Sequence, residues 1–124
     1  MNRKNFLVKI FNVALEAVKK NEILIKKLPK KPTGKGRVIV VGAGKASSLM
    51  ASILEDHWKG VSMTGLIITQ YGYKTKTKLI NVVEASHPTP GSIGLKYTKK
   101  ILEKLKNLNK EDTVVFLISG GGSS

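Results

Sequence analysis

Three short segments of the sequence combine glycine and serine with basic residues in a way that suits the binding of an anion. They are GAGKAS (42–47), ASHPTPGS (85–92) and SGGGSS (119–124), and each follows a run of apolar residues. Glycine has no Cβ atom, so successive backbone N–H groups can turn toward one anion, and hydroxyl and ammonium groups add further donors. The segments therefore predict a site for a phosphate or carboxylate group.

The segment GAGKAS contains the most informative of these residues, Lys45. A helix that begins near Ala46 would offer its free N–H groups to an anion. The helix dipole disfavours a lysine in the first turn by about 0.3–1 kcal/mol, whereas a bound phosphate would make this placement favourable. We therefore predict that Lys45 contacts an anion; the alternative is an exposed lysine at a frayed helix start. The other binding candidates in this segment are Gly42, Gly44 and Ser47.

Neither of the two common nucleotide-binding loops matches GAGKAS. The dinucleotide fingerprint needs a third glycine or alanine where Ser47 stands, and an acidic residue at the end of the second strand, where the sequence has TQ (69–70). The Walker loop would need glycine in place of Ile39 and serine or threonine in place of Ala46. The segment thus predicts an anion site of another kind.

The segment ASHPTPGS is stiffened by two prolines, which disfavour helix for the residues just before them. Because this fixes where the imidazole of His87 points, His87 is a candidate for ligand contact, with a simple turn as the alternative. The other histidine, His57, lies beside Trp58 at a helix end and is expected to be structural. With two histidines, no cysteine and no carboxylate cluster, we expect no metal site built by this chain alone.

The segment SGGGSS repeats the pattern of GAGKAS more strongly. Its candidate binding residues are Ser119, Gly120, Gly121, Gly122 and Ser123. A flexible tail is the alternative, but the attachment of this segment to an apolar run typical of a buried strand favours the anion site.

Apolar periodicity predicts the elements that must position these segments. Residues such as Phe6, Ile10 and Val18 recur at helical spacing and predict an amphipathic helix that runs to about residue 27. Apolar runs at 37–41, 64–69, 79–86 and 113–119 then alternate with helical patterns at 46–58 and 92–108.

Continuously apolar runs are typical of parallel strands that are buried on both faces by helices. We therefore predict an α/β fold with a three-layer, doubly wound (Rossmann-like), mostly parallel sheet of at least four strands, preceded by an amphipathic helix. Ligands of such sheets bind outside the carboxyl ends of the strands, near the point where the winding reverses. The three segments should therefore share one edge of the sheet.

The composition limits the class of protein. The chain has 124 residues, 41% of them hydrophobic, and its longest apolar run is too short to span a membrane. The absence of cysteine and of a recognisable signal peptide fits the cytoplasm. The net charge is +14, but 20 of the 22 basic residues are lysine. Because base readout favours arginine, a solvated basic surface is expected rather than a nucleic-acid site.

Taken together, three motifs in this order and spacing resemble the N-terminal domain of the two-domain glycerate 2-kinase family, members of which also carry the name hydroxypyruvate reductase. The motifs are VIVVGAGKASSLMA (38–51), EASHPTPGS (84–92) and VVFLISGGGSS (114–124). The resemblance covers essentially the whole chain. It implies that residues 1–124 are the N-terminal part of a Rossmann-like domain in a longer two-domain enzyme, with the active site between the domains.

The resemblance also implies an activity. ATP, with Mg²⁺, would phosphorylate the 2-hydroxyl of D-glycerate to give 2-phosphoglycerate, and the family's active-site lysine would fall on Lys45. The family's histidine would fall on His87 and its phosphate loop on residues 119–123. The second domain of the same polypeptide would be required, so the fragment alone should be nearly inactive. Whether the protein forms a homo-oligomer is left open. The alternatives are a sugar-phosphate-binding or isomerase domain without ATP turnover and a basic nucleic-acid-binding module.

Overall fold

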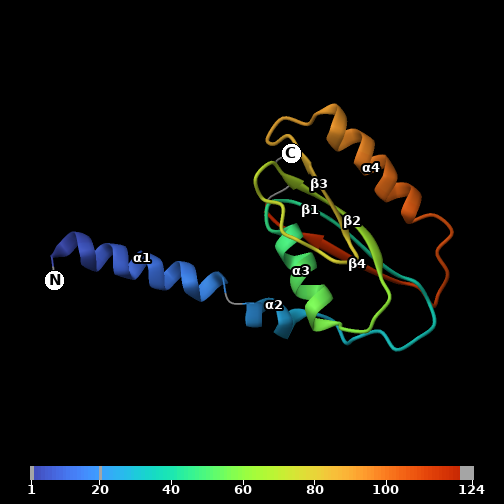
Figure 1. Cartoon of the computed structure of the whole chain (residues 1–124), viewed down its shortest axis with the longest axis horizontal. Helices are drawn as coiled ribbons and strands as arrows, with labels where there is room; N and C mark the ends of the chain where they lie inside the picture. Colours follow the sequence, from blue (N-terminus) through green and yellow to red (C-terminus); the bar gives the residue numbers. More distant parts are fainter. Residues whose placement is uncertain (1, 20, 121–124) are drawn as a thin grey trace.

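The computed structural model describes residues 2–19 and 21–120 (Figure 1). The helices are α1 (Arg3–Lys19), α2 (Asn21–Lys27), α3 (Ser47–His57) and α4 (Ser92–Lys104), and the strands are β1 (Val38–Ala43), β2 (Thr64–Gln70), β3 (Asn81–Ala85) and β4 (Thr113–Ile118). Within these residues, no helix is both long and apolar enough to cross a membrane.

The four strands form one parallel sheet in the order β3-β2-β1-β4. The chain moves outward from β1 through β2 to β3, then crosses to the other side of β1 to form β4. Connections between parallel strands are almost always right-handed, so a reversal of direction puts the two crossover helices on opposite faces. Accordingly, α3 and α4 lie on opposite sides of the sheet (Figure 1). The predicted doubly wound fold is confirmed, and its switch point lies between β1 and β4.

The main core lies between the sheet and α3. Leu54 and Trp58 are 0% and 1% exposed and pack with strand residues that include Val40 and Ile67. β1 is buried along most of its length, as its continuous apolar run predicts. β4 departs from this prediction, since Phe116 is 58% exposed. The reason is that α4 packs on β2 and β3 and leaves this face of β4 uncovered.

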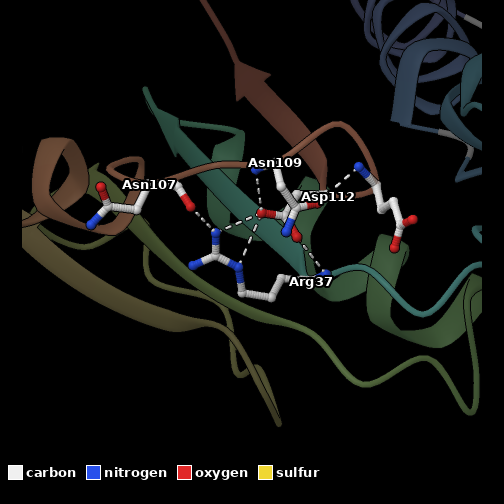
Figure 2. A network of polar contacts seen from close by, with 5 residues as sticks. Arg37, Asn107, Asn109 and Asp112 are labelled. Carbon is white, nitrogen blue, oxygen red and sulfur yellow. Dashed lines mark hydrogen bonds and ion pairs between the residues drawn. The ribbon is translucent and has the colours of Figure 1, made fainter.

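An ion pair joins the residues that directly precede β1 and β4, Arg37 and Asp112 (Figure 2). It lies at the amino ends of these strands, whereas the candidate segments follow the carboxyl ends. Arg37 Nη2 lies 2.6 Å from Asp112 Oδ2, and the Arg37 backbone N–H donates to Asp112 Oδ1 at 2.8 Å. Hydrogen bonds from Arg37 and from the Asn109 N–H lower the pKa of Asp112 to about 2. This network was not predicted, because the turn that contains Asp112 looks ordinary in the sequence.

A second carboxylate fixes the chain before β3. Glu55 of α3 is buried and accepts three backbone N–H groups, from Lys78 (2.7 Å), Leu79 (2.8 Å) and Ile80 (2.7 Å). A buried carboxylate is costly unless it is well hydrogen-bonded, and here the backbone supplies the donors. Glu55 therefore ties the β2–β3 connection to α3.

Helix α1 projects away from the sheet (Figure 1). Its large apolar side chains are exposed, among them Leu7 at 64% and Phe11 at 62%. The predicted single helix to about residue 27 is present as two helices, α1 and α2.

Candidate anion site at the β1–β4 junction

The segments that follow β1 and β4 are in direct contact, and we call this region, residues 42–48 and 118–120, the β1–β4 junction. The Ser119 N–H donates to the Ala43 carbonyl at 3.2 Å, and the Ala46 N–H donates to Ser119 Oγ at 2.9 Å. Gly44 has φ +117°, and a Cβ atom there would lie 2.3 Å from the Ser119 carbonyl oxygen. Only glycine allows this approach, so two of the three predicted segments meet at the switch point.

Two hydroxyl groups hold the segment after β1 in place by hydrogen bonds to its backbone. Ser47 is fully buried, and its Oγ and the Thr69 Oγ1 both donate to the Gly44 carbonyl, the latter at 3.1 Å. The hydroxyl of Ser47 thus holds the turn in place. α3 begins at Ser47, whose own N–H donates to the Gly44 carbonyl at 3.2 Å, while the Ala46 N–H is used by Ser119 Oγ. Within the described residues, the Ser48 and Leu49 N–H groups are therefore the donors of the first turn that have no hydrogen-bond acceptor. The junction therefore presents helix N–H donors, the arrangement that favours anions.

Lys45 is exposed at the junction and close to the aromatic ring of Tyr73. Its Nζ lies 5.7 Å from the ring centroid, within the range of a cation–π interaction. Tyr73 is held in turn by α3, because Ser48 Oγ donates to the Tyr73 carbonyl at 3.0 Å. Tyr73 was not among the predicted site residues. Its position in the segment YGY (71–73), which directly follows β2, was the signal that could have identified it.

The segment after β4 is described as far as Gly120. This residue has φ +80°, and no atom of residues 2–19 and 21–120 lies within 4 Å of where its Cβ would be. Gly120 therefore makes a left-handed turn, a conformation that glycine adopts readily. The predictions for Gly121, Gly122 and Ser123 lie outside the described residues.

The third segment follows β3, which β2 separates from β1. His87 is half-buried, and its peptide bond to Pro88 is cis. Ser86 Oγ donates to the Thr89 carbonyl at 2.9 Å within this turn. All strands are parallel, so His87 lies at the same edge of the sheet as Lys45 but outside the contact between the other two segments. The role of His87 stays a prediction.

The junction suits an anionic group better than a metal ion. Within residues 2–19 and 21–120, no group of three or more His, Asp or Glu side chains could hold a metal. The described donors at the junction are instead backbone N–H groups and the Lys45 ammonium. Such donors fit the phosphates of ATP or a carboxylate, and they offer no oxygen ligands to Mg²⁺.

The chain is similar to known proteins over almost its whole length. A family model described as a domain of unknown function, DUF4147, matches residues 6–124. The chain is 38% identical over its whole length to a protein of Agrobacterium vitis named "Putative hydroxypyruvate reductase", of which it covers 28%. It is 35% identical over 98% of its length to the D-glycerate 2-kinase of Thermotoga maritima, of which it covers 29%.

A solved structure agrees with these relatives. The crystal structure of glycerate kinase from Thermotoga maritima superposes on 98% of this chain with a TM-score of 0.75 and 34% identity, and the chain covers 29% of it. The fold is that of a doubly wound α/β domain, and its switch point carries the candidate anion site. The chain belongs to the DUF4147 family, the N-terminal domain of the glycerate 2-kinases. It spans a little over a quarter of the length of these relatives.

Proposed function

We propose that this chain forms part of a kinase that transfers the γ-phosphate of ATP to the 2-hydroxyl of D-glycerate, giving 2-phosphoglycerate and ADP. The observation that carries the proposal is the β1–β4 junction, where the backbone before α3 contacts Ser119 and Lys45 stands exposed in the same segment, with its ammonium beside the ring of Tyr73. The relatives named glycerate 2-kinase support the choice of substrate.

The relatives carry two names, and the residues of this chain favour the kinase over the reductase. A nicotinamide-dependent reductase with a dinucleotide fingerprint would need a third glycine or alanine at Ser47 and an acidic residue after β2 for the ribose hydroxyl. Here Ser47 is buried and bonded to the Gly44 carbonyl, and β2 ends in Gln70. The junction thus lacks both the third glycine or alanine and the acidic residue of that fingerprint. Its helix start and Lys45 are compatible with a phosphate group.

Phosphoryl transfer asks for positioning and charge stabilisation more than for covalent chemistry by the protein. Lys45 would act as a point charge on the transferring or substrate oxygens, and Tyr73 would help to hold its ammonium at the junction. The free N–H groups at the start of α3 would bind phosphate or carboxylate oxygens. Gly42, Gly44 and Ser119 would fix the backbone that supports these donors.

Mg²⁺, when bound with ATP, would neutralise charge on the phosphates. Its ligands would come from residues other than those described at the junction. The second domain expected in the full-length protein would form the other wall of the site, so the 124-residue chain alone should show almost no turnover.

The test is release of ADP by the full-length protein with ATP and Mg²⁺, with and without D-glycerate. We expect glycerate-dependent release and a loss in kcat of more than about a hundredfold in Lys45→Ala, as for the removal of one preorganised donor. Lys26→Ala, at an exposed lysine of α2, is the matched control and should keep normal turnover.

Three results would contradict the proposal. Near-normal turnover in folded Lys45→Ala would remove Lys45 from the mechanism. Oxidation of NADH or NADPH by hydroxypyruvate without ADP release would favour the reductase. Binding of sugar phosphates without ATP consumption would favour a non-kinase domain.

A further inference from the structure

A second cationic surface lies in a groove of about 790 Å³ between α4 and β3, the strand at one edge of the described sheet. Five lysines line it: Lys74, Lys76 and Lys78 from the β2–β3 connection, and Lys100 and Lys104 from α4. None of the junction residues lines this groove. The groove is therefore lined by its own set of residues, although Lys74 directly follows Tyr73, whose ring lies beside Lys45.

Most of the positive charge in the groove is uncompensated. The single acidic lining residue, Glu103, is paired with Lys106 at 2.7 Å. Lys78 is paired with Asp56 at 2.9 Å. The other four lysines have no acidic partner within 4.0 Å among residues 2–19 and 21–120. Like charges held around one concavity repel each other, and a multiply charged anion between them would relieve that repulsion.

Apolar and aromatic side chains form the floor of the groove: Leu66 is buried, and Val83 and Tyr97 are half-buried there. Ile80 and Val82 border the groove as well, but their side chains belong to the core under α3. Lys100 Nζ lies 4.8 Å from the centroid of the Tyr97 ring, which keeps an ammonium beside an aromatic surface. A ligand with both phosphate groups and a flat apolar part would match this combination.

The size of the groove favours a small molecule. Sites for small ligands are typically about 300–1,000 Å³ and mainly apolar, with a few polar groups that orient the ligand. Lysine binds phosphate as a mobile point charge and does not need the bidentate geometry of arginine. We propose that the groove between α4 and β3 is a second anion site that binds a nucleoside polyphosphate, with the phosphates among Lys74, Lys76, Lys100 and Lys104 and the base on the floor beside Tyr97.

The test uses the full-length protein with ATP and, separately, inorganic tripolyphosphate, at about 0.1 M salt so that weak surface attraction is screened. Hydrogen exchange should slow in residues 74–83 and 97–104 as well as at the junction. In a variant with Lys74, Lys76, Lys100 and Lys104 changed to Gln, that protection should be lost and the affinity of this site should fall at least about tenfold, since each lost cation removes a phosphate contact.

The matched control changes Lys26, Lys27, Lys30 and Lys35 to Gln, four exposed lysines with the same total charge. It should change affinity less than about twofold and keep protection at 74–83 and 97–104. Tyr97→Leu should weaken ATP more than tripolyphosphate, because only ATP has a base to place on the floor. Because Lys45→Ala leaves the groove intact, it should keep this protection even if the proposed kinase activity is absent.

The proposal is overturned if neither probe protects residues 74–83 and 97–104. It is equally overturned if both lysine variants lose the same affinity, since net charge alone would then explain the binding. Protection restricted to residues 42–48 would assign all polyphosphate binding to the junction.

Discussion

Helices α1 and α3 have similar apolar stripes in the sequence, but only the stripe of α3 is buried in the structure. α3 packs along the sheet and buries Leu54 completely, whereas α1 projects away from the sheet (Figure 1) and leaves Leu7 64% exposed. Apolar periodicity predicts that a helix has a face that water does not favour, but it does not say what covers that face. In α3 the covering element is the sheet that its own flanking strands form. In α1 no described element packs on the stripe, so α1 should contribute little to the stability of the domain.

The largest difference is expected from the same substitution made in each helix. Leu54→Ala should lower the free energy of unfolding of the 124-residue chain by about 2–5 kcal/mol, because it leaves a cavity in the core. Leu7→Ala should change it by less than about 0.5 kcal/mol, as for most surface positions. Urea denaturation of both variants measures this, and equal losses would show that α1 packs on the domain in solution.

A second pair compares two glycines. At Gly42, a Cβ would lie 2.1 Å from the Leu117 carbonyl oxygen, whereas at Gly34, before the sheet, nothing lies within 4 Å. Gly42→Ala should therefore separate β1 from β4 and cost about 1–3 kcal/mol, as overpacking does. Gly34→Ala should be nearly neutral. Thermal unfolding by circular dichroism would test this, and an unchanged midpoint for Gly42→Ala would show that the strands are not this close.

A third pair compares two glutamates. Glu55→Gln replaces one of the oxygens that accept the Lys78, Leu79 and Ile80 N–H groups with an amide NH₂, so at least one buried N–H loses its acceptor. The expected cost is about 1–2 kcal/mol. Glu16→Gln on exposed α1 makes the same change in charge and should have no measurable effect. Faster hydrogen exchange at residues 78–80 in Glu55→Gln alone would support the difference; equal exchange in both variants would contradict it.

The smallest of these changes in stability should appear at acidic pH. The pKa of Asp112 is about 2 in the folded chain, below the ordinary value of about 3.9, because Arg37 and backbone N–H groups favour its charged form. A depressed pKa stabilises the fold above the unfolded value and stops doing so as pH falls through the folded value. Stability should thus fall between about pH 4 and pH 2. Asp112→Asn should be less stable at pH 7 and lose less in that range; an acid profile identical to that of the parent chain would contradict this.

The sequence predicted the fold well because most of its signals are local. Continuous apolar runs identified all four strands, and the reversal of winding brought Lys45 and Ser119 to one edge, where a general rule about such sheets expects ligands. Residues whose role depends on distant partners were missed. Arg37 and Asp112 are 75 residues apart, and Tyr73 meets Lys45 only after β2 has returned the chain to the same edge.

The geometry of the junction could be predicted only in part, for the same reason. The glycines identify flexible turns, but the contact of Gly44 with Ser119 arises from the pairing of β1 with β4. The burial of Ser47 follows from the packing of α3, which the sequence pattern gives only as a helix face. His87 was predicted to contact a ligand because two prolines stiffen its loop. The stiffness of a loop does not predict how far the loop lies from the junction.

The most direct test of this account is a crystal structure of the full-length protein with a non-hydrolysable ATP analogue, Mg²⁺ and D-glycerate. We expect a phosphate or carboxylate oxygen within about 3.2 Å of Lys45 Nζ and of a backbone N–H in the first turn of α3. Ligands bound with no anionic oxygen near Lys45 or the start of α3 would contradict the claim that the β1–β4 junction is the reactive site.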